Sequence, residues 1–401
     1  MKVLQSVVIL TLLIALPALA KPPKPQTFTP VVTPNGVTLP FVLDHGVKVF
    51  HLIAEPVQHE IAPGMIVNAW GYNGQTPGPT IEAVEGDRVR ILVTNKLPEP
   101  TSVHWHGVLL PSGMDGVSGL TQPHILPGET YVYEFTLRQH GTQMYHPHAD
   151  EATQMALGME GFFVIHPRKE KPKIDRDFAI FLHEWDVPPG AMTPNPNAMS
   201  DFNLFTFNGR AYPGTDPLIV KKGDRVRVRL ANLSMDSHPI HIHGFHFVVT
   251  GTDGGTTPLA ARLPETTVNV PPGSTRDFEF IADAEGDWAM HCHKSHHAMN
   301  QMKHDVPNML GVNQEGVEEK VRKFLPGYMA MGQNGMDDMA EMRMDSPPNV
   351  LPMMAGEGPF GAVGMGGMFT VVKVRAGLTN YADPGWYKNP EGTLAKPVPT
   401  P

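Results

Sequence analysis

The feature of this 401-residue chain that most constrains its fold is an internal repeat. The run Gly-Asp-Arg-Val-Arg at 86–90 recurs at 223–227, an offset of 137 residues, and the pair Pro-Gly at 127–128 recurs at 272–273, an offset of 145. These two offsets also superimpose four histidines on four others: His104 on His241, His106 on His243, His146 on His291 and His148 on His293. Self-similarity at fixed offsets indicates duplicated structural units. We therefore expect two homologous domains, over residues 45–168 and 175–375, joined near 167–172.

Both units are expected to consist of short β-strands. The chain contains 39 Gly and 41 Pro, which place turn signals between short alternating runs such as Arg88–Val93 and Arg225–Leu230. A last strand is expected over Phe369–Arg375, and the best helical periodicity is limited to residues 317–325. The predicted fold class is therefore all-β, with each domain a β-sandwich or barrel.

The two ends of the chain and its net charge limit where it works and what it binds. The first twenty residues have the pattern of a secretory signal peptide, with Lys2, an apolar run over 3–13 and a small-residue cleavage site before Lys21. We expect export to the periplasm or secretion, and no membrane span after cleavage. Residues 21–44 then form a Pro-rich linker and 376–401 a C-terminal tail. A formal net charge of −9 offers no basic surface for a nucleic acid.

The superimposed histidines form four His-x-His pairs. In a strand, residues i and i+2 point to the same face, so each pair presents two imidazoles in one direction. One such pair alone is more often an exposed polar stripe. Four pairs placed by a repeat provide eight imidazoles, which exceeds what a zinc site uses, and imidazole is a good ligand for copper. The pattern therefore predicts a cluster of several copper ions.

The second unit contains a further ligand set that the first lacks. Where the second unit has His238, Cys292, His297 and Met302, the offsets give Thr101, Pro147, Ala152 and Leu157 in the first. A thiolate, two imidazoles and a weak axial thioether are the ligands of a blue copper site. Cys292 is the only cysteine in the chain, and its place between His291 and His293 favours a ligand over a small buried hydrophobic residue.

Together these motifs resemble those of the multicopper oxidases. In chain order they are Tyr72-Asn73-Gly74, Pro77-Gly78-Pro79-Thr80, His104-Trp105-His106-Gly107, Tyr145-His146-Pro147-His148, His238-Pro239-Ile240-His241-Ile242-His243-Gly244 and the block from His291 to Met302. The resemblance implies two cupredoxin-like Greek-key domains, as in the two-domain small laccases. Copper nitrite reductases also have two such domains, but they carry the blue site in the first domain and lack His-Cys-His, so this alternative fails.

The resemblance further implies four copper ions per chain and a role for each ligand. The type 2 copper takes His104 and His241, one type 3 copper takes His106, His146 and His293, the other takes His148, His243 and His291, and the type 1 copper takes His238, Cys292, His297 and Met302. It also implies a proton-supplying catalytic acid in the loop after the first His-x-His pair, where Asp115 stands. An aspartate before a glycine is equally typical of a simple turn.

The reducing substrate has to be inferred from outside the copper motifs. Ten of the 23 methionines lie between 329 and 368. Thioethers prefer Cu(I), so we expect a segment that collects cuprous ions, which resembles the Met-rich inserts of periplasmic cuprous oxidases. A few methionines would more often fill irregular gaps in a core. We therefore expect an oxidase that couples Cu(I) oxidation to reduction of dioxygen to water, in copper tolerance. A laccase-like oxidase of phenols or aromatic amines and a non-enzymatic copper-sequestering protein remain alternatives.

The short connection between the domains bears on assembly. A trinuclear copper site needs ligands from both units facing each other, and two domains joined over 167–172 have little freedom to turn the required faces together. A ring in which the first domain of one chain meets the second domain of the next solves this problem. The resemblance to small laccases implies three chains, so we expect a homotrimer with trinuclear copper sites at its subunit interfaces.

Overall fold

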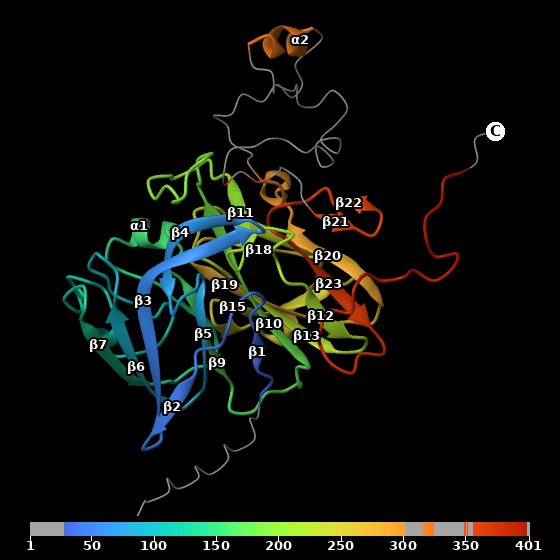
Figure 1. The fold of residues 1–401 in the computed structure, drawn as a ribbon. Helices are drawn as coiled ribbons and strands as arrows, with labels where there is room; N and C mark the ends of the chain where they lie inside the picture. Colours follow the sequence, from blue (N-terminus) through green and yellow to red (C-terminus); the bar gives the residue numbers. More distant parts are fainter. Residues whose placement is uncertain (1–27, 301–315, 325–348, 350, 352–355, 399–401) are drawn as a thin grey trace, which may run out of the picture.

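The computed structural model describes residues 28–300, 316–324, 349, 351 and 356–398 (Figure 1). Within these ranges the regular secondary structure is almost entirely β-strand, which confirms the expected fold class. The predicted signal peptide, Met302 and most of the Met-rich segment lie outside the described residues. No helix among the described residues is long and apolar enough to cross a membrane.

Two sheets enclose the first core. One contains β2 (Phe41–Asp44), β3 (Val47–Ala62), β4 (Met65–Tyr72), β6 (Arg88–Asn95) and β7 (Thr130–Thr136). The other contains β5 (Gly78–Val84), β9 (Gly161–His166) and β8 (Gly141–Tyr145). β6 alternates buried and more exposed positions, as its Arg-Val-Arg-Ile-Leu-Val sequence predicts for a strand with one face on a core. Trp105 is fully buried in this core among Tyr133, Tyr145 and Phe163.

Two sheets, of eight and five strands, enclose the second core. The first contains β1 (Val31–Val32), β10 (Arg176–Trp185), β11 (Leu204–Phe207), β13 (Arg225–Asn232), β15 (Phe247–Thr252), β16 (Gly255–Thr256), β17 (Pro264–Glu265) and β19 (Ser274–Ile281). The other contains β12 (Leu218–Lys221), β23 (Phe369–Arg375), β20 (Gly286–Cys292), β14 (His238–Ile242) and β18 (Thr267–Val270). A small hairpin of β21 (Glu357–Gly358) and β22 (Gly361–Ala362) precedes β23. The strands expected near 88, 225 and 369 are thus confirmed as β6, β13 and β23.

Helices are short and few among the described residues. α2 (Val317–Arg322) confirms the helix expected from the apolar spacing over 317–325. α1 (Glu151–Ala156) was not predicted. Single turns of 3₁₀ helix occur as η1 (Ser112–Met114), η2 (Leu259–Ala261) and η3 (Ser295–Ala298).

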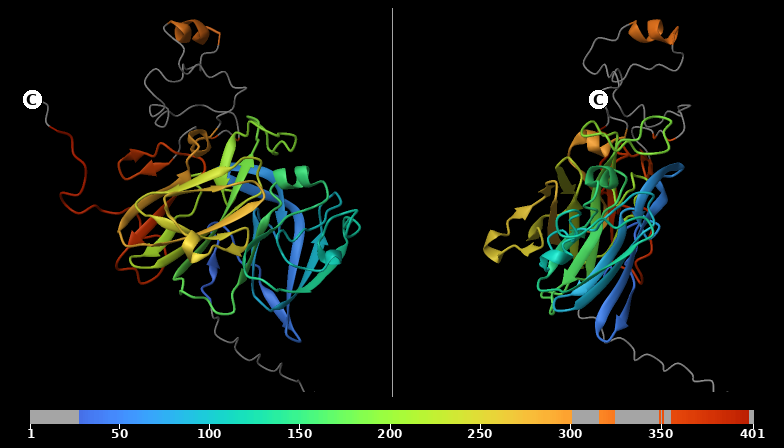
Figure 2. Two further views of the ribbon diagram at one scale, coloured as in Figure 1. Left: turned by 180° about the vertical axis from the view of Figure 1, so that it is seen from behind. Right: turned by 90° about the vertical axis from the view of Figure 1, so that its left-hand side faces the viewer.

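The two sandwiches lie side by side and are held together by strands as well as by apolar contacts (Figure 2). β1, from the stretch expected to be a Pro-rich linker, pairs in parallel with β10 of the second sandwich, and β2 pairs with β3 of the first. Between residues 28 and 44 this stretch therefore contributes one strand to each sandwich. A separate apolar cluster joins Phe162 and Val164 of β9 to Phe181 of β10 and Ala231 of β13.

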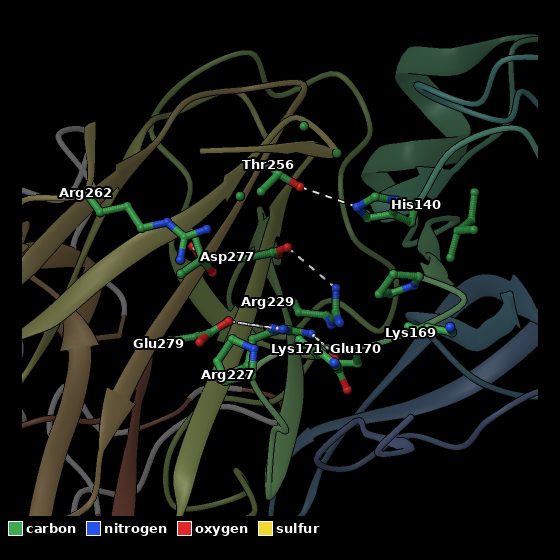
Figure 3. A pocket seen from close by; sticks show the side chains of 18 residues that line it. His140, Lys169, Glu170, Lys171, Arg227, Arg229, Thr256, Arg262, Asp277 and Glu279 are labelled. Carbon is green, nitrogen blue, oxygen red and sulfur yellow. Dashed lines mark hydrogen bonds and ion pairs between the residues drawn. The ribbon is translucent and has the colours of Figure 1, made fainter. Parts of the chain in front are cut away.

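A buried ion network also crosses between the sandwiches. Arg229, 2% exposed, binds both carboxylate oxygens of Asp177 at 2.8 Å and donates to the Thr142 hydroxyl at 2.7 Å. Thr142, on β8 of the first sandwich, donates in turn to Asp277 at 2.6 Å. Arg229 and Asp277 line a cavity of about 250 Å³ between the sandwiches and the connecting segment 167–172, with Arg227 and Glu279 also on its wall (Figure 3).

Candidate metal centre

The first sandwich gathers the four histidines of its two His-x-His motifs, here called the first quartet: His104, His106, His146 and His148. Antiparallel backbone pairing of His104 with His146 sets the arrangement, through hydrogen bonds of 2.8 and 3.2 Å. The ring centroid of His104 lies 5.7 Å from that of His106, 5.3 Å from that of His146 and 5.7 Å from that of His148. Ligand atoms of His104, His106 and His146 all lie within 4.8 Å of one another, close enough to share a metal ion.

Hydrogen bonds to main-chain carbonyls set the orientation of two rings of the first quartet. His104 donates from Nδ1 to the main-chain carbonyl of Asp115 at 2.8 Å, and His146 donates from Nδ1 to the carbonyl of Pro147 at 2.9 Å. In a neutral imidazole this leaves Nε2 as the unprotonated nitrogen. Nε2 of His146 lies 3.3 Å from Nδ1 of His106. Such outer partners are typical of metal-binding histidines, because they set the tautomer and the ring orientation.

The second sandwich repeats this arrangement with the second quartet: His241, His243, His291 and His293. His241 pairs with His291 across β14 and β20. His241 donates from Nδ1 to the carbonyl of Thr266 and His291 donates from Nδ1 to that of Cys292, both at 2.8 Å. Nε2 of His291 lies 3.2 Å from Nε2 of His243. The sequence repeat therefore reproduces both the ring cluster and its supporting hydrogen bonds.

Each quartet is assembled within one sandwich, and the chain does not bring the two together. Among the described residues, which include all eight histidines, every ring contact of a quartet member with another quartet histidine stays inside its own quartet. No group of residues close enough to hold a metal mixes the two quartets within the part of the chain that the structure describes.

The predicted blue-site residues that the structure describes form a compact cysteine trio: His238, Cys292 and His297. Sγ of Cys292 lies 3.8 Å from Nδ1 of His238 and 3.7 Å from Nδ1 of His297. All three side chains are fully buried, and the ring of His297 stacks on Phe205 with centroids 3.9 Å apart. The fourth predicted ligand, Met302, lies outside the described residues.

The hydrogen bonds around His238 identify which of its two ring nitrogens is unprotonated and able to bind a metal. Ser234 donates its hydroxyl to Asn232 at 2.6 Å, so at its 2.9 Å contact with Nε2 of His238 the hydroxyl oxygen is the acceptor. Nε2 therefore carries the proton and Nδ1 is left unprotonated. An unprotonated imidazole nitrogen beside a thiol is the donor set of a soft transition metal.

Burial shifts the pKa values of these groups so that the neutral form of each is favoured over the charged form. Desolvation raises the pKa of the Cys292 thiol to about 12 and lowers the pKa of His238 to about 3 and of His297 to about 2. Desolvation likewise lowers the pKa of His146 to about 3. The imidazoles are therefore neutral at pH 7, as metal ligands must be, whereas Cys292 needs a bound cation to stabilise its thiolate.

Three acidic residues near these clusters were missed by sequence reasoning. Glu151 lies 3.7 Å from Nδ1 of His146 and 3.6 Å from Nε2 of His148. Glu184 lies 3.4 Å from Nε2 of His238, and burial together with the charge of Asp236 raises the pKa of Glu184 to about 7. Asp236 itself lies 3.6 Å from Nε2 of His297. Glu151 could have been found three residues after His148, but no spacing links Glu184 to the copper motifs.

Asp115, the predicted catalytic acid, lies beside the first quartet. It follows η1, and its Oδ1 is 3.5 Å from Nδ1 of His104. Its side chain is 32% exposed, so it contacts both the quartet and solvent.

Comparison with known proteins agrees with this geometry. Two family models described as multicopper oxidase match the chain, one over residues 54–170 and the other over 187–310. Each match contains one histidine quartet, and the second also contains the cysteine trio.

Similar curated proteins match only part of their own length. A probable nitrite reductase-hydroxylamine oxidoreductase fusion protein from Kuenenia stuttgartiensis is 31% identical over 62% of this chain and 30% of the relative. Copper resistance protein A from Escherichia coli is 40% identical over 33% of this chain and 22% of the relative. This chain therefore spans less than a third of either relative. The crystal structure of a blue copper oxidase from Nitrosomonas europaea matches with a TM-score of 0.60 and 26% identity, over 81% of this chain and 85% of that one.

Proposed function

Because this chain belongs to the multicopper oxidase family, we propose that it couples one-electron oxidation of Cu(I) to four-electron reduction of dioxygen to water, in copper tolerance. The observation that carries the proposal is the position of Cys292. Its Sγ lies within 3.8 Å of both trio imidazoles, while its chain neighbours His291 and His293 belong to the second quartet. One short stretch of backbone thus connects the cysteine trio to the quartet.

The residues present fit a copper complement of four ions per chain. His238, Cys292, His297 and Met302 are proposed to hold the type 1 copper. The two quartets are proposed to share the type 2 and the two type 3 coppers, with His104 and His241 on the type 2 ion, His106, His146 and His293 on one type 3 ion and His148, His243 and His291 on the other. Bound copper supplies the redox chemistry that dioxygen reduction requires. The carbonyls that hold Nδ1 of His104, His146, His241 and His291 support this proposal, because they leave Nε2 free to bind metal.

Asp115 is proposed to supply protons to the reaction. Dioxygen reduction consumes protons, and a carboxyl group 3.5 Å from the His104 ring with 32% of its side chain exposed can exchange protons with solvent on one side. Asp115→Asn preserves the size of the side chain and removes its proton. We expect this variant to lower the rate of oxygen uptake while leaving the copper content unchanged.

The proposal includes a cyclic homotrimer with the copper clusters at its subunit interfaces. Each of the three copper ions in this proposal needs ligands from both quartets. Within one chain, no group of described residues close enough to hold a metal mixes the two quartets, so one chain alone does not provide these sites. A ring brings the first quartet of one chain against the second quartet of the next, with repeated heterologous contacts that close on themselves. The leader-like sequence over residues 1–20 supports export, so we place the working enzyme in the periplasm or outside the cell.

Cu(I) is proposed as the reducing substrate for two reasons. The chain has ten methionines between 329 and 368, and it is 40% identical to copper resistance protein A over the matched 135 residues. The experiment that tests the proposal measures copper per chain, then oxygen uptake with Cu(I) and with 2,6-dimethoxyphenol in parallel. Turnover of Cu(I) at much higher kcat/KM than the phenol is the expected result. The reverse ranking would establish a laccase-like oxidase, and bound copper without oxygen uptake would establish a sequestering protein.

A further inference from the structure

A small cleft next to the cysteine trio is lined by three methionines that the copper motifs do not include. Met155 comes from α1 of the first sandwich, Met199 from the loop between β10 and β11, and Met235 from the segment between β13 and β14. The cleft has a volume of about 70 Å³ and is otherwise lined mainly by apolar side chains. Three segments that are distant in the sequence thus contribute one thioether each to the same place. We call it the methionine cleft.

Filling of the core does not account for Met199 and Met235, whereas Met155 packs against the apolar cluster that joins the sandwiches. Met199 and Met235 are each 58% exposed, whereas a methionine that fills a gap in a core is covered by its neighbours. Met192 lies on the same loop as Met199 and is 45% exposed, but it does not line the cleft. Met192 therefore provides a matched comparison for the cleft methionines.

The cleft also borders a buried histidine with an unused nitrogen. His183, on β10, lines the cleft and is 3% exposed. Its Nδ1 lies 2.9 Å from Oε1 of the buried Glu160. Its Nε2 is shielded from solvent and has no hydrogen-bond partner among the described residues. A buried polar atom without a partner is costly, so an imidazole nitrogen left in this state beside thioethers indicates a ligand for that nitrogen.

Short contacts connect the cleft to the cysteine trio. Ser234, which lines the cleft next to Met235, accepts a hydrogen bond of 2.9 Å from Nε2 of His238. The backbone N–H of Met235 donates to Oε2 of Glu184 at 3.2 Å, and Oε1 of Glu184 lies 3.4 Å from the same Nε2 of His238. A ligand held by Met235 is therefore separated from His238 by a few bonds and one hydrogen bond.

We propose that the methionine cleft binds Cu(I), with Met155, Met199 and Met235 as thioether ligands and Nε2 of His183 as an imidazole ligand, and that it presents this ion to His238. The inference rests on the proposed function for its redox step. Thioethers select Cu(I) over Cu(II), so oxidation in the cleft weakens binding and favours release of the product. Each Cu(I) loses one electron, which enters the chain at His238, and dioxygen is the final acceptor. Four Cu(I), one dioxygen and four protons give four Cu(II) and two waters.

Methionine oxidation footprinting on the copper-loaded enzyme tests the cleft residue by residue. Ag(I) serves as a redox-inert probe for Cu(I), and hydrogen peroxide oxidises exposed thioethers to sulfoxides that mass spectrometry locates. Met199 and Met235 are expected to oxidise readily without Ag(I) and at least tenfold more slowly with stoichiometric Ag(I). Met192 is expected to oxidise at the same rate in both conditions. Unchanged oxidation of Met199 and Met235 at saturating Ag(I) would overturn the proposal.

Kinetics then connect the cleft to turnover. The double variant Met199→Leu/Met235→Leu keeps side-chain volume and is expected to raise KM for Cu(I) about tenfold, with kcat/KM for 2,6-dimethoxyphenol within twofold of the wild type and the blue absorbance unchanged. Met192→Leu is the control and should change none of these values. A loss confined to the phenol would mean that the cleft takes an aromatic ring, which overturns the proposal. Ag(I) protection in a wild type that takes up no oxygen with Cu(I) would refute the proposed function and leave the cleft as a Cu(I) site.

Discussion

Nδ1 of His238 lies 3.1 Å from Nδ1 of His297, although the two histidines are 59 positions apart in the chain. Because Nε2 of His238 carries the proton, its Nδ1 presents a lone pair toward the other ring and toward Sγ of Cys292. Sγ of Cys292 lies beside both rings, so two imidazoles and one sulfur converge in a fully buried site, which is the donor set that a soft metal cation binds. This geometry provides the physical basis for the first prediction.

Replacing Cys292 with serine is expected to abolish both the blue colour and turnover. The thiolate is the proposed source of the intense absorption and the proposed route for electrons to the second quartet, whereas a hydroxyl is a poor ligand for this site. Copper analysis should show one ion fewer per chain, with the ions at the quartets retained. Wild-type protein that is fully loaded with copper and colourless would refute the type 1 assignment.

Deletion of residues 329–344 tests the predicted role of the Met-rich segment. This stretch contains six of the ten clustered methionines and lies outside the described residues. We expect kcat/KM for Cu(I) to fall strongly, because thioethers that collect Cu(I) are lost. Activity on bulky organic substrates should be unchanged or higher. An equal loss on both substrates would indicate that the segment is needed for folding.

Much of the fold, and the close approach of the predicted histidines within each sandwich, followed from the sequence because the information was local or repeated. Alternating runs predicted β6, β13 and β23, and the repeat aligned His104 with His241, which occupy equivalent positions in the two quartets. The pairing of β1 with β10 was not predicted, because a two-residue strand in a Pro-rich stretch has no period to detect.

The parts of the site that escaped prediction depend on contacts between distant segments. Glu184 lies beside His238, and Met155 and Met235 line the same cleft, only because segments far apart in the chain pack against each other. No spacing in the sequence encodes such a contact. Physical features that reveal it, such as an unpartnered buried nitrogen on His183, exist only in the folded chain.

Replacing Arg229, which is buried at the interface between the sandwiches, with alanine is expected to destabilise the protein strongly. Arg229→Ala leaves the carboxylate of Asp177, which is fully buried, without its two hydrogen bonds of 2.8 Å. Breaking a buried ion pair in this way costs about 3–5 kcal/mol of the free energy of unfolding. Denaturant melts measure the effect. Lys173→Ala removes an exposed ion pair with Asp175 and serves as the control, with no change expected.

Acid is expected to destabilise the fold in part through His59, which is outside the copper motifs. Desolvation lowers the pKa of His59 in the folded protein from 6.5 to about 4. Below pH 6.5 the unfolded state therefore binds a proton at His59 that the folded state does not bind. The contribution of His59 to the free energy of unfolding is complete above pH 6.5 and decreases as the pH falls toward 4. One pKa unit corresponds to about 1.36 kcal/mol, which gives a loss of about 3 kcal/mol by pH 4.

The variant His59→Gln isolates this effect, because glutamine keeps a donor for the carbonyl of Gly209, to which Nε2 of His59 donates at 2.6 Å. Its free energy of unfolding should depend less on pH than that of the wild type between pH 6.5 and 4, when both proteins carry the same copper. Identical pH dependence in the two proteins would show that His59 does not titrate differently on folding.

Complementation between two inactive variants tests the proposed ring. One variant, His104→Ala/His106→Ala, lacks ligands of the first quartet, and the other, His241→Ala/His243→Ala, lacks ligands of the second. Each variant alone should be inactive. When both are unfolded together and refolded with copper, a ring would contain some interfaces that pair an intact first quartet with an intact second quartet of the next chain, and partial oxygen uptake should return. Because no group of described residues close enough to hold a metal mixes the two quartets, this recovery would depend on neighbouring chains. Absence of recovery, together with a monomeric mass in solution, would mean that the cluster forms within one chain.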